Sequence, residues 1–155
     1  MEIEKKYLIS LDNVPIKLDD YTCLTLEQAY LCTEPVVRVR KENSNYYMTY
    51  KSEGFLAREE YNLPLDATSY AHLLGKADGT VISKKRYVIP LTDNNLHKKL
   101  SIELDVFEGK YDGLCIAEIE FESIDDANAF EPPLWFGEDV TYEKKYHNSE
   151  MSKAL

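Results

Sequence analysis

The sequence has little of what would assign the protein to a common class at once. It contains three cysteines, none in a Cys-x-x-Cys pair, so neither a disulfide framework nor a zinc site is indicated. No apolar run approaches the roughly 18 residues of a membrane span, and charges stand where a signal peptide has its apolar segment. We therefore expect one cytoplasmic domain over residues 1–155, with its cysteines reduced.

Positive charge is also scarce. The chain has 18 Lys and Arg against 28 Asp and Glu, for a formal net charge of −10. This balance argues against a nucleic-acid partner, because binding to a nucleic-acid backbone depends on neutralising its phosphates. It indicates no attraction to a membrane surface either, so a polyanionic small molecule would need a locally basic pocket.

Familiar phosphate-binding and catalytic motifs are absent. The chain contains no GxxxxGK[ST], GxGxxG, HExxH or GxSxG pattern. Any contacts to phosphate would therefore have to come from side chains. The three histidines, His72, His97 and His147, are expected on the surface or in structural roles.

Alternation with a period of two is the strongest pattern that the sequence does contain. It predicts strands at residues 2–9, 36–41, 46–52, 83–90, 101–109 and 117–123. In each strand the charged residues that alternate with apolar ones share one face. Capping signals predict four short helices: Thr25 with Gln28 before residues 26–31, Asp66 before residues 67–74, Ser123 with Asp126 before residues 124–130, and Asn148 or Ser149 near the end.

The charges on these strands are segregated by sign. Carboxylates pair at positions 2/4, 103/105 and 118/120, and cations pair at 38/40 and 84/86. One interpretation is an antiparallel sheet with a solvated face. The other is a closed barrel whose interior has an acidic wall and a basic wall, where buried charges need ions or partners. Alternation alone leaves both interpretations open.

Two such walls would suit a metal-bound phosphate chain. Magnesium is commonly held by a few carboxylates together with phosphate oxygens and water. Guanidinium groups match phosphate oxygens two at a time, and lysine adds a point charge. Magnesium and manganese are not separated by this reasoning, because both accept oxygen ligands in similar geometry.

The pattern Glu2-x-Glu4-x-Lys6 resembles the ExExK signature of the CYTH superfamily, the triphosphate tunnel metalloenzymes. Further segments resemble its short bacterial members in order and spacing. They are VVRVRKENSNYYMTYKSEG, REEYNLPL, SKKRYVIP, IELDVFEGKYDGL, AEIEFES and PPLWFGEDVTYEKKYHNS. The resemblance covers nearly the whole chain and implies an α+β fold, with an eight-stranded antiparallel β-barrel, flanking helices and a tunnel that binds triphosphate compounds.

The resemblance also implies roles for individual residues. Phosphate contacts would come from Lys6, Arg38, Arg40, Lys51, Arg58, Lys84 and Arg86. Metal contacts would come from Glu2, Glu4, Glu60, Glu103, Asp105, Glu118 and Glu120. Catalysis would rest on Glu118, Glu120, Lys6 and Arg40.

Glu60 and Tyr30 each leave a choice open, and the tail has an implied role as well. Glu60 is preferred over its neighbour Glu59 without the strand register being fixed. Tyr30 would either gate the tunnel or pack near Lys6. The tail would close one tunnel mouth, with contacts from Lys144, Lys145 and Tyr146.

The implied activity is hydrolysis of the terminal phosphate of inorganic triphosphate with Mg²⁺ or Mn²⁺, with two ions expected. Three alternatives stay open. A class IV type adenylate cyclase would need an apolar slot for a base, and a thiamine triphosphatase would need aromatic residues at the mouth. A non-catalytic polyphosphate-binding module would bind phosphate without a metal.

Overall fold

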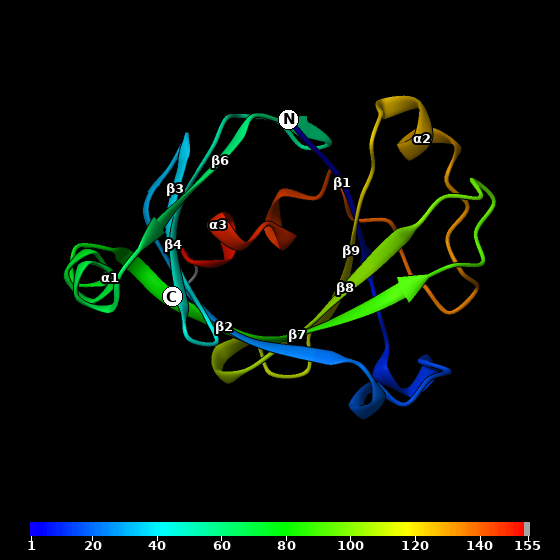
Figure 1. Cartoon of the computed structure of the whole chain (residues 1–155), viewed down its shortest axis with the longest axis horizontal. Helices are drawn as coiled ribbons and strands as arrows, with labels where there is room; N and C mark the ends of the chain where they lie inside the picture. The colour runs from blue at the N-terminus through cyan, green and yellow to red at the C-terminus, as the bar shows by residue number, and fades with distance from the viewer. Residues whose placement is uncertain (154–155) are drawn as a thin grey trace.

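A computed structural model describes residues 1–153, whose strands form a ring (Figure 1). The strands make one antiparallel sheet in the order β5-β1-β9-β8-β7-β2-β3-β4-β6. They are β1 (Glu2–Leu8), β2 (Thr22–Thr33), β3 (Val36–Glu42), β4 (Asn45–Lys51), β5 (Ala57–Arg58), β6 (Glu60–Leu65), β7 (Asp78–Leu91), β8 (Leu100–Phe107) and β9 (Cys115–Glu120).

The ring closes where β5 and β6 meet. β5 pairs with β1 and β6 pairs with β4, so the two ends of the strand order are joined through the single residue Glu59. The backbone N–H of Glu59 donates to Ser52 Oγ at 2.8 Å, and its carbonyl oxygen accepts from the Ser52 N–H at 3.0 Å. The expected barrel is confirmed, with nine strands instead of eight because this bend divides one strand in two.

The period of two seen in the sequence separates the inside of the barrel from the outside. In β1, Ile3 and Tyr7 are buried in the largest hydrophobic cluster, whereas Glu2, Glu4 and Lys6 line an interior cavity. Residues of β7, β8, β9 and α2 (Ile124–Ala129) also belong to that cluster. The hydrophobic core therefore lies outside the barrel wall, and the charged faces surround its interior instead of forming an outer solvated face.

Two helices lie outside the ring, on opposite sides of it in Figure 1. α1 (Ala67–Leu74) begins as predicted, because the Asp66 side chain accepts from a backbone N–H of the first turn at 2.7 Å. α2 also begins as predicted, because Ser123 Oγ accepts from the Asp126 backbone N–H at 3.0 Å. Within residues 1–153 no helix has the length and apolar character needed to cross a membrane.

A third short helix, α3 (Asn148–Met151), lies across the ring in Figure 1. The expected position of its cap is wrong, because His147 occupies that position and its side chain makes no capping hydrogen bond. Four short 3₁₀ turns complete the structure: η1 (Leu11–Asn13), η2 (Leu18–Asp20), η3 (Gly109–Tyr111) and η4 (Lys144–Tyr146).

The helix expected at residues 26–31 is wrong. These residues belong to β2, which pairs with β3 on one side and with β7 on the other. The Thr25/Gln28 pattern is a local signal worth about 1 kcal/mol, and pairing with two strands within a closed barrel outweighs it. As a consequence, Gln28 and Tyr30 are brought to the interior of the barrel, where Tyr30 lines the cavity.

Candidate active site

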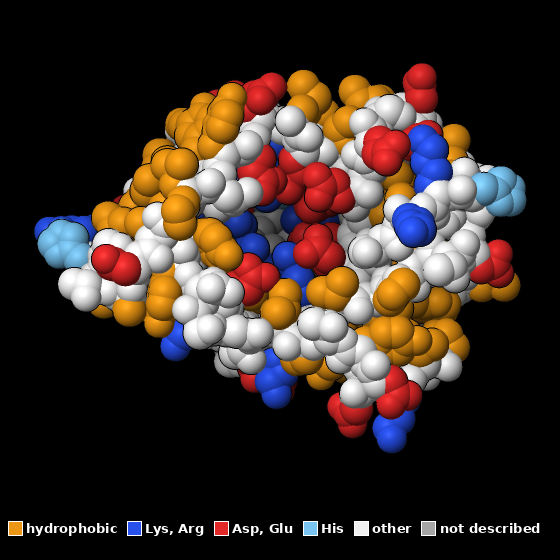
Figure 2. All heavy atoms as spheres, in the orientation of Figure 1, with side chains coloured by type: hydrophobic (Ala, Val, Ile, Leu, Met, Phe, Trp, Pro, Cys, Tyr) orange, Lys and Arg blue, Asp and Glu red, His pale blue; other side chains and the backbone are white. Residues whose placement is uncertain are grey.

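The barrel interior holds a cavity of about 320 Å³. Figure 2 shows acidic and basic side chains facing each other within a central hollow. All seven predicted phosphate-binding cations line it, as do six of the seven predicted metal ligands: Glu2, Glu4, Glu60, Glu103, Glu118 and Glu120. The seventh, Asp105, is wholly buried within the wall.

The strand order separates the two signs of charge around the ring. The adjacent strands β1, β9 and β8 carry the acidic wall: Glu2, Glu4, Glu103, Glu118 and Glu120. The strands β7, β3 and β4, with β2 between the first two, carry the basic wall: Arg38, Arg40, Lys51, Lys84 and Arg86. The segregation seen in the sequence therefore becomes a spatial separation. Among the described residues, Lys6 is the one cavity-lining cation on an acidic strand.

The two walls are held together by ion pairs where β7 meets β8. The Asp105 carboxylate accepts hydrogen bonds from Arg86 Nε at 2.7 Å and from Arg86 Nη2 at 2.9 Å. Lys84 Nζ lies 2.6 Å from the same carboxylate. Arg86 also contacts Glu103 at 2.9 Å and Glu118 at 3.3 Å. Burial lowers the pKa of Lys84 to about 7, although Asp105 opposes the shift. Asp105 thus holds two cations of the basic wall in place.

A second group of ion pairs lies where β4, β5 and β6 approach β1. Lys51 Nζ contacts Glu2 at 3.1 Å and Glu60 at 3.7 Å, and Arg58 Nε contacts Glu2 at 3.5 Å. Glu60 lines the cavity, whereas Glu59 is exposed. The register therefore favours Glu60 as the residue of the site.

Arg38 and Arg40 differ from the other tunnel cations. Neither forms an ion pair with a carboxylate within the part of the chain that the structure describes. Arg38 donates only to Thr49 Oγ1 at 3.3 Å, and its buried Nε has no hydrogen-bond partner among residues 1–153. Arg40 donates to the neutral Gln28 at 2.9 Å, and burial together with Arg38 and Arg86 lowers its pKa to about 9. Because a buried donor without a partner is rare, this pair of guanidinium groups is suited to an anionic ligand.

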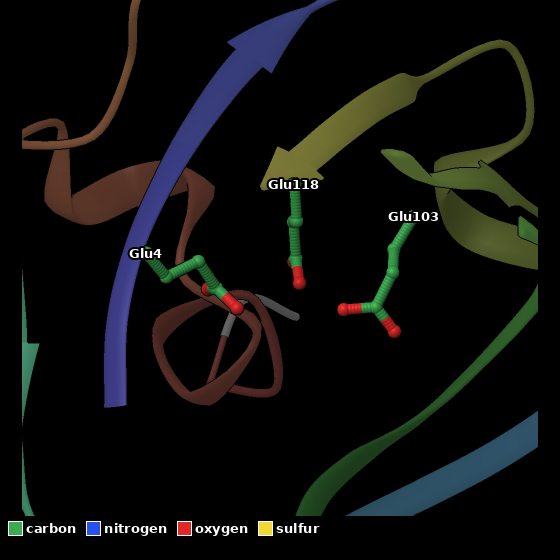
Figure 3. A group of neighbouring side chains, drawn as sticks. All are labelled: Glu4, Glu103 and Glu118. Carbon is green, nitrogen blue, oxygen red and sulfur yellow. The ribbon is translucent and has the colours of Figure 1, made fainter. Parts of the chain in front are cut away.

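Three carboxylates on the acidic wall could share a metal ion. Glu4, Glu118 and Glu103 come from the neighbouring strands β1, β9 and β8, and their side chains point toward one another (Figure 3). One oxygen from each lies within 4.8 Å of the others. Burial, with Glu118 and Glu2 nearby, raises the pKa of Glu4 to about 8, as expected for crowded carboxylates that a cation would stabilise.

Glu118 and Glu120 have different surroundings although both were predicted to act in catalysis. Burial alone would raise the pKa of Glu118, but Lys6, at 3.2 Å, and Arg86 hold it well below its ordinary value. The Glu120 side chain has no hydrogen bond or ion pair in residues 1–153, and burial together with Glu60 and Glu103 raises its pKa. Glu118 is therefore a fixed anion, whereas Glu120 is a carboxylate free to accept a proton.

The C-terminal segment contributes to the cavity through residues other than those expected. Lys144 and Lys145 are exposed, and Lys144 instead borders an adjoining cavity of about 290 Å³. His147, Asn148 and Ser149 line the tunnel in their place. Burial and the nearby Lys6 lower the pKa of His147 to about 4, so this histidine is neutral.

Other residues of the site were also missed, and strand parity could have found two of them. Glu42 has the parity of Arg38 and Arg40, and Asn62 has the parity of Glu60; both line the cavity. Tyr30 lines it as well, buried, with its hydroxyl accepting from Gln28 at 2.9 Å. Its role as a gate remains a prediction.

Comparison with known families identifies this arrangement. Residues 1–155 match the family described as the CYTH domain. The chain belongs to the CYTH domain family. A relative of this CYTH chain from Nitrosomonas europaea, named inorganic triphosphatase, is 38% identical over 157 residues, which cover 99% of this chain and 98% of the relative. A second relative, from Acetivibrio thermocellus and with the same name, is 34% identical over 159 residues. The match covers 98% of this chain and 93% of that relative.

The fold of this CYTH chain is shared with a protein of known structure. The crystal structure of an inorganic triphosphatase superposes with a TM-score of 0.71 at 35% identity, covering 100% of this chain and 96% of that one. The resemblance inferred from Glu2-x-Glu4-x-Lys6 and the later segments is therefore confirmed.

Proposed function

We propose that this CYTH protein is an inorganic triphosphatase, which hydrolyses the terminal phosphoanhydride bond of tripolyphosphate within the barrel. The observation that carries the proposal is that Arg38 and Arg40 have no carboxylate partner among residues 1–153. Both face a cavity whose other wall gathers Glu4, Glu103 and Glu118. The two arginines provide hydrogen-bond donors for a polyanion, and the three carboxylates provide oxygen ligands for its metal counter-ion. The names of the relatives, at 38% and 34% identity over nearly the whole chain, support the same activity.

The basic wall would bind and align the substrate. Arg38 and Arg40 lie two residues apart on β3 and each has guanidinium donors to offer phosphate oxygens. Lys84 and Arg86 on β7 continue the line of charge. Because phosphoryl transfer depends mainly on positioning and charge stabilisation, fixed cations of this kind act on the transition state as well as on binding.

The donor set of Glu4, Glu103 and Glu118 fits a hard divalent cation, which takes carboxylate oxygens. Such an ion, Mg²⁺ or Mn²⁺, would polarise phosphate oxygens and lower the pKa of a bound water. A second ion, with Glu2, Glu60, Asp105 or Glu120 among its ligands, remains a prediction, as does a cytoplasmic location. Lys6, at 3.2 Å from Glu118 and 3.7 Å from Glu4, would bring one more positive charge to the phosphates nearest this group.

Glu120 is proposed to orient the attacking water and to accept its proton. It lines the cavity beside Glu4, the residue opposite it on β1, and carries no ion pair within the described chain. Its raised pKa suits a general base. Glu120→Gln should therefore lower kcat sharply while tripolyphosphate still binds, which single-turnover kinetics and calorimetry would separate.

The test of function compares phosphate release from tripolyphosphate, ATP and thiamine triphosphate with Mg²⁺, with Mn²⁺ and with a chelator. We expect rapid release from tripolyphosphate that the chelator abolishes. Pyrophosphate and a cyclic product from ATP would indicate a cyclase instead, and faster release from thiamine triphosphate would indicate that activity. Binding that survives the chelator without any release would indicate a polyphosphate-binding module.

A further inference from the structure

Two amide side chains connect the basic wall to the C-terminal helix. Gln28 lies on β2, is wholly buried and faces the barrel interior. Asn148 is the first residue of α3, is buried, and lines the cavity. The two residues are 120 positions apart in the sequence, and their side chains are hydrogen bonded to each other at 3.2 Å.

These amides also hold one cation each. Gln28 Oε1 accepts from Arg40 Nε at 2.9 Å, and Asn148 Oδ1 accepts from Lys84 Nζ at 3.0 Å. Arginine and lysine can only donate, so the two cations fix which end of each amide is the oxygen. The amide nitrogen of Gln28 then donates to Asn148 Oδ1 and to the Tyr30 hydroxyl. The result is one continuous chain from Arg40 through Gln28 and Asn148 to Lys84, defined here as the amide relay.

The position of Asn148 depends on how α3 is attached to the barrel. The Thr80 N–H donates to the Ser152 carbonyl oxygen at 2.7 Å, and the Tyr111 hydroxyl donates to the Met151 carbonyl oxygen at 2.8 Å. Gly79 has a φ of +71° and lies so close to the Ser152 carbonyl that a Cβ there would overlap it. One backbone hydrogen bond, one side-chain hydrogen bond and one glycine therefore fix α3 in place.

The choice of amides rather than carboxylates has a physical consequence. A carboxylate at position 28 would orient Arg40 equally well, but it would also neutralise the charge that an anionic ligand needs. A neutral acceptor orients the guanidinium and leaves its full charge available. Arg40 has no carboxylate partner in residues 1–153, so Gln28 orients it without such a loss.

We propose that Gln28 and Asn148 are positioning residues of the phosphate site. The amide relay holds Arg40 and Lys84 at the cavity wall, and it makes the assembly of this wall depend on the docking of α3. The proposal rests on the proposed function, because it assigns Arg40 and Lys84 to the binding of phosphate. Neither amide is assigned a bond to the reacting atoms.

A double-mutant cycle on the full-length protein tests the relay through the coupling of Asn148 to Lys84. Asn148→Leu removes the acceptor at little change in volume, and we expect kcat/KM for tripolyphosphate to fall roughly 10- to 100-fold. In a Lys84→Met background the same substitution should cost less than about 3-fold, because its partner is already gone. In a Lys51→Met background it should cost the full factor, since Lys51 contacts Glu2 and Glu60 instead.

Two further variants separate positioning from folding. Asn95→Leu is the control, because the Asn95 amide also makes two hydrogen bonds but lies away from the tunnel. Its partners are the backbone groups of Ala129 and Glu131. It should lower the melting temperature without changing kcat/KM. Asn148→Asp keeps an acceptor for Lys84, so kcat should stay within about 10-fold of wild type while KM rises from the added negative charge. If Asn148→Leu does not fold, the kcat and KM of Asn148→Asp still test the proposal.

The relay is overturned if Asn148→Leu costs the same factor in all three backgrounds, if it costs nothing, or if Asn148→Asp loses kcat as fully as Asn148→Leu. Failure of the proposed function is a separate result, because it appears in the wild-type protein as absence of phosphate release. In that case the same cycle is measured on tripolyphosphate binding by calorimetry. Coupling of Asn148 with Lys84 but not with Lys51 would then still support the relay.

Discussion

Arg38 and Arg86 are both arginines of the basic wall, but their substitution should have opposite effects on stability. Arg38 donates one hydrogen bond to Thr49, and its Nε has no partner among residues 1–153. Arg38→Met therefore strands no carboxylate and removes the cost of a buried charge, so the melting temperature should be unchanged or higher. Arg86→Met leaves the buried carboxylates of Asp105 and Glu118 without their guanidinium partner.

The sizes of these effects follow from the contacts. Charge-assisted hydrogen bonds contribute about 1.5–3 kcal/mol each, so loss of the phosphate contacts of Arg38 should cost about 3 kcal/mol, or roughly 100-fold in kcat/KM. Because charge develops on the phosphates in the transition state, kcat should fall along with affinity. Breaking a buried pair costs about 3–5 kcal/mol, which for Arg86→Met corresponds to a fall in melting temperature of about 10 °C.

The assay combines thermal unfolding with steady-state kinetics on tripolyphosphate. The single tryptophan, Trp135, packs against the main hydrophobic cluster and reports unfolding by its fluorescence. We expect Arg38→Met to lower kcat/KM roughly 100-fold without lowering the melting temperature, and Arg86→Met to lower the melting temperature. The reasoning is refuted if Arg38→Met keeps full kcat, or if both variants melt at the same lowered temperature.

Three further predictions concern Glu4, Glu60 and His147. Glu4→Gln should abolish metal-dependent phosphate release, by at least roughly 100-fold in kcat/KM, and should weaken Mg²⁺ binding measured by calorimetry, since it removes one of three clustered carboxylates. Glu60→Gln should reduce kcat/KM about 10-fold, whereas Glu59→Gln on the exposed side should leave it at the wild-type value; equal effects would show that the register is not as described. The pKa of His147 is lowered to about 4 in the folded protein, so the unfolded chain binds its proton first as pH falls, and stability should decrease between about pH 6.5 and 4. Melting temperatures across that range should show a smaller decrease for His147→Gln, which cannot take up a proton; identical pH profiles would contradict the assignment.

Strand parity predicted most of the site because the barrel wall separates two environments. A residue such as Ile3 must pack outside while Glu4 faces inward, so a one-residue error in register would bury charge in the core. Alternation therefore located Arg38, Lys84 and Glu118 without coordinates. It did not decide between a barrel and an open sheet, because both give the same period; the residues resembling the CYTH superfamily supplied that distinction.

The errors arose where long-range contacts overrode local signals. The Thr25/Gln28 pattern predicted a helix, but pairing of β2 with both β3 and β7 made this segment a strand and brought Gln28 inside. His147 and Asn148 have no periodic neighbours that would mark them as tunnel residues. Their position depends on contacts of α3 with β7, more than 60 residues earlier in the chain, which no local pattern encodes.

The pairing of opposite charges on the barrel interior means that a ligand must exchange one counter-ion for another when it binds. Five of the seven tunnel cations have carboxylate partners: Lys6, Lys51, Arg58, Lys84 and Arg86. Phosphate oxygens that enter would replace carboxylates as counter-ions of these cations, and a divalent cation would take up the carboxylates so released. Bound phosphate leaves carboxylates available to the metal ion, and the bound metal ion leaves cations available to phosphate. Metal and polyphosphate should therefore each strengthen the binding of the other.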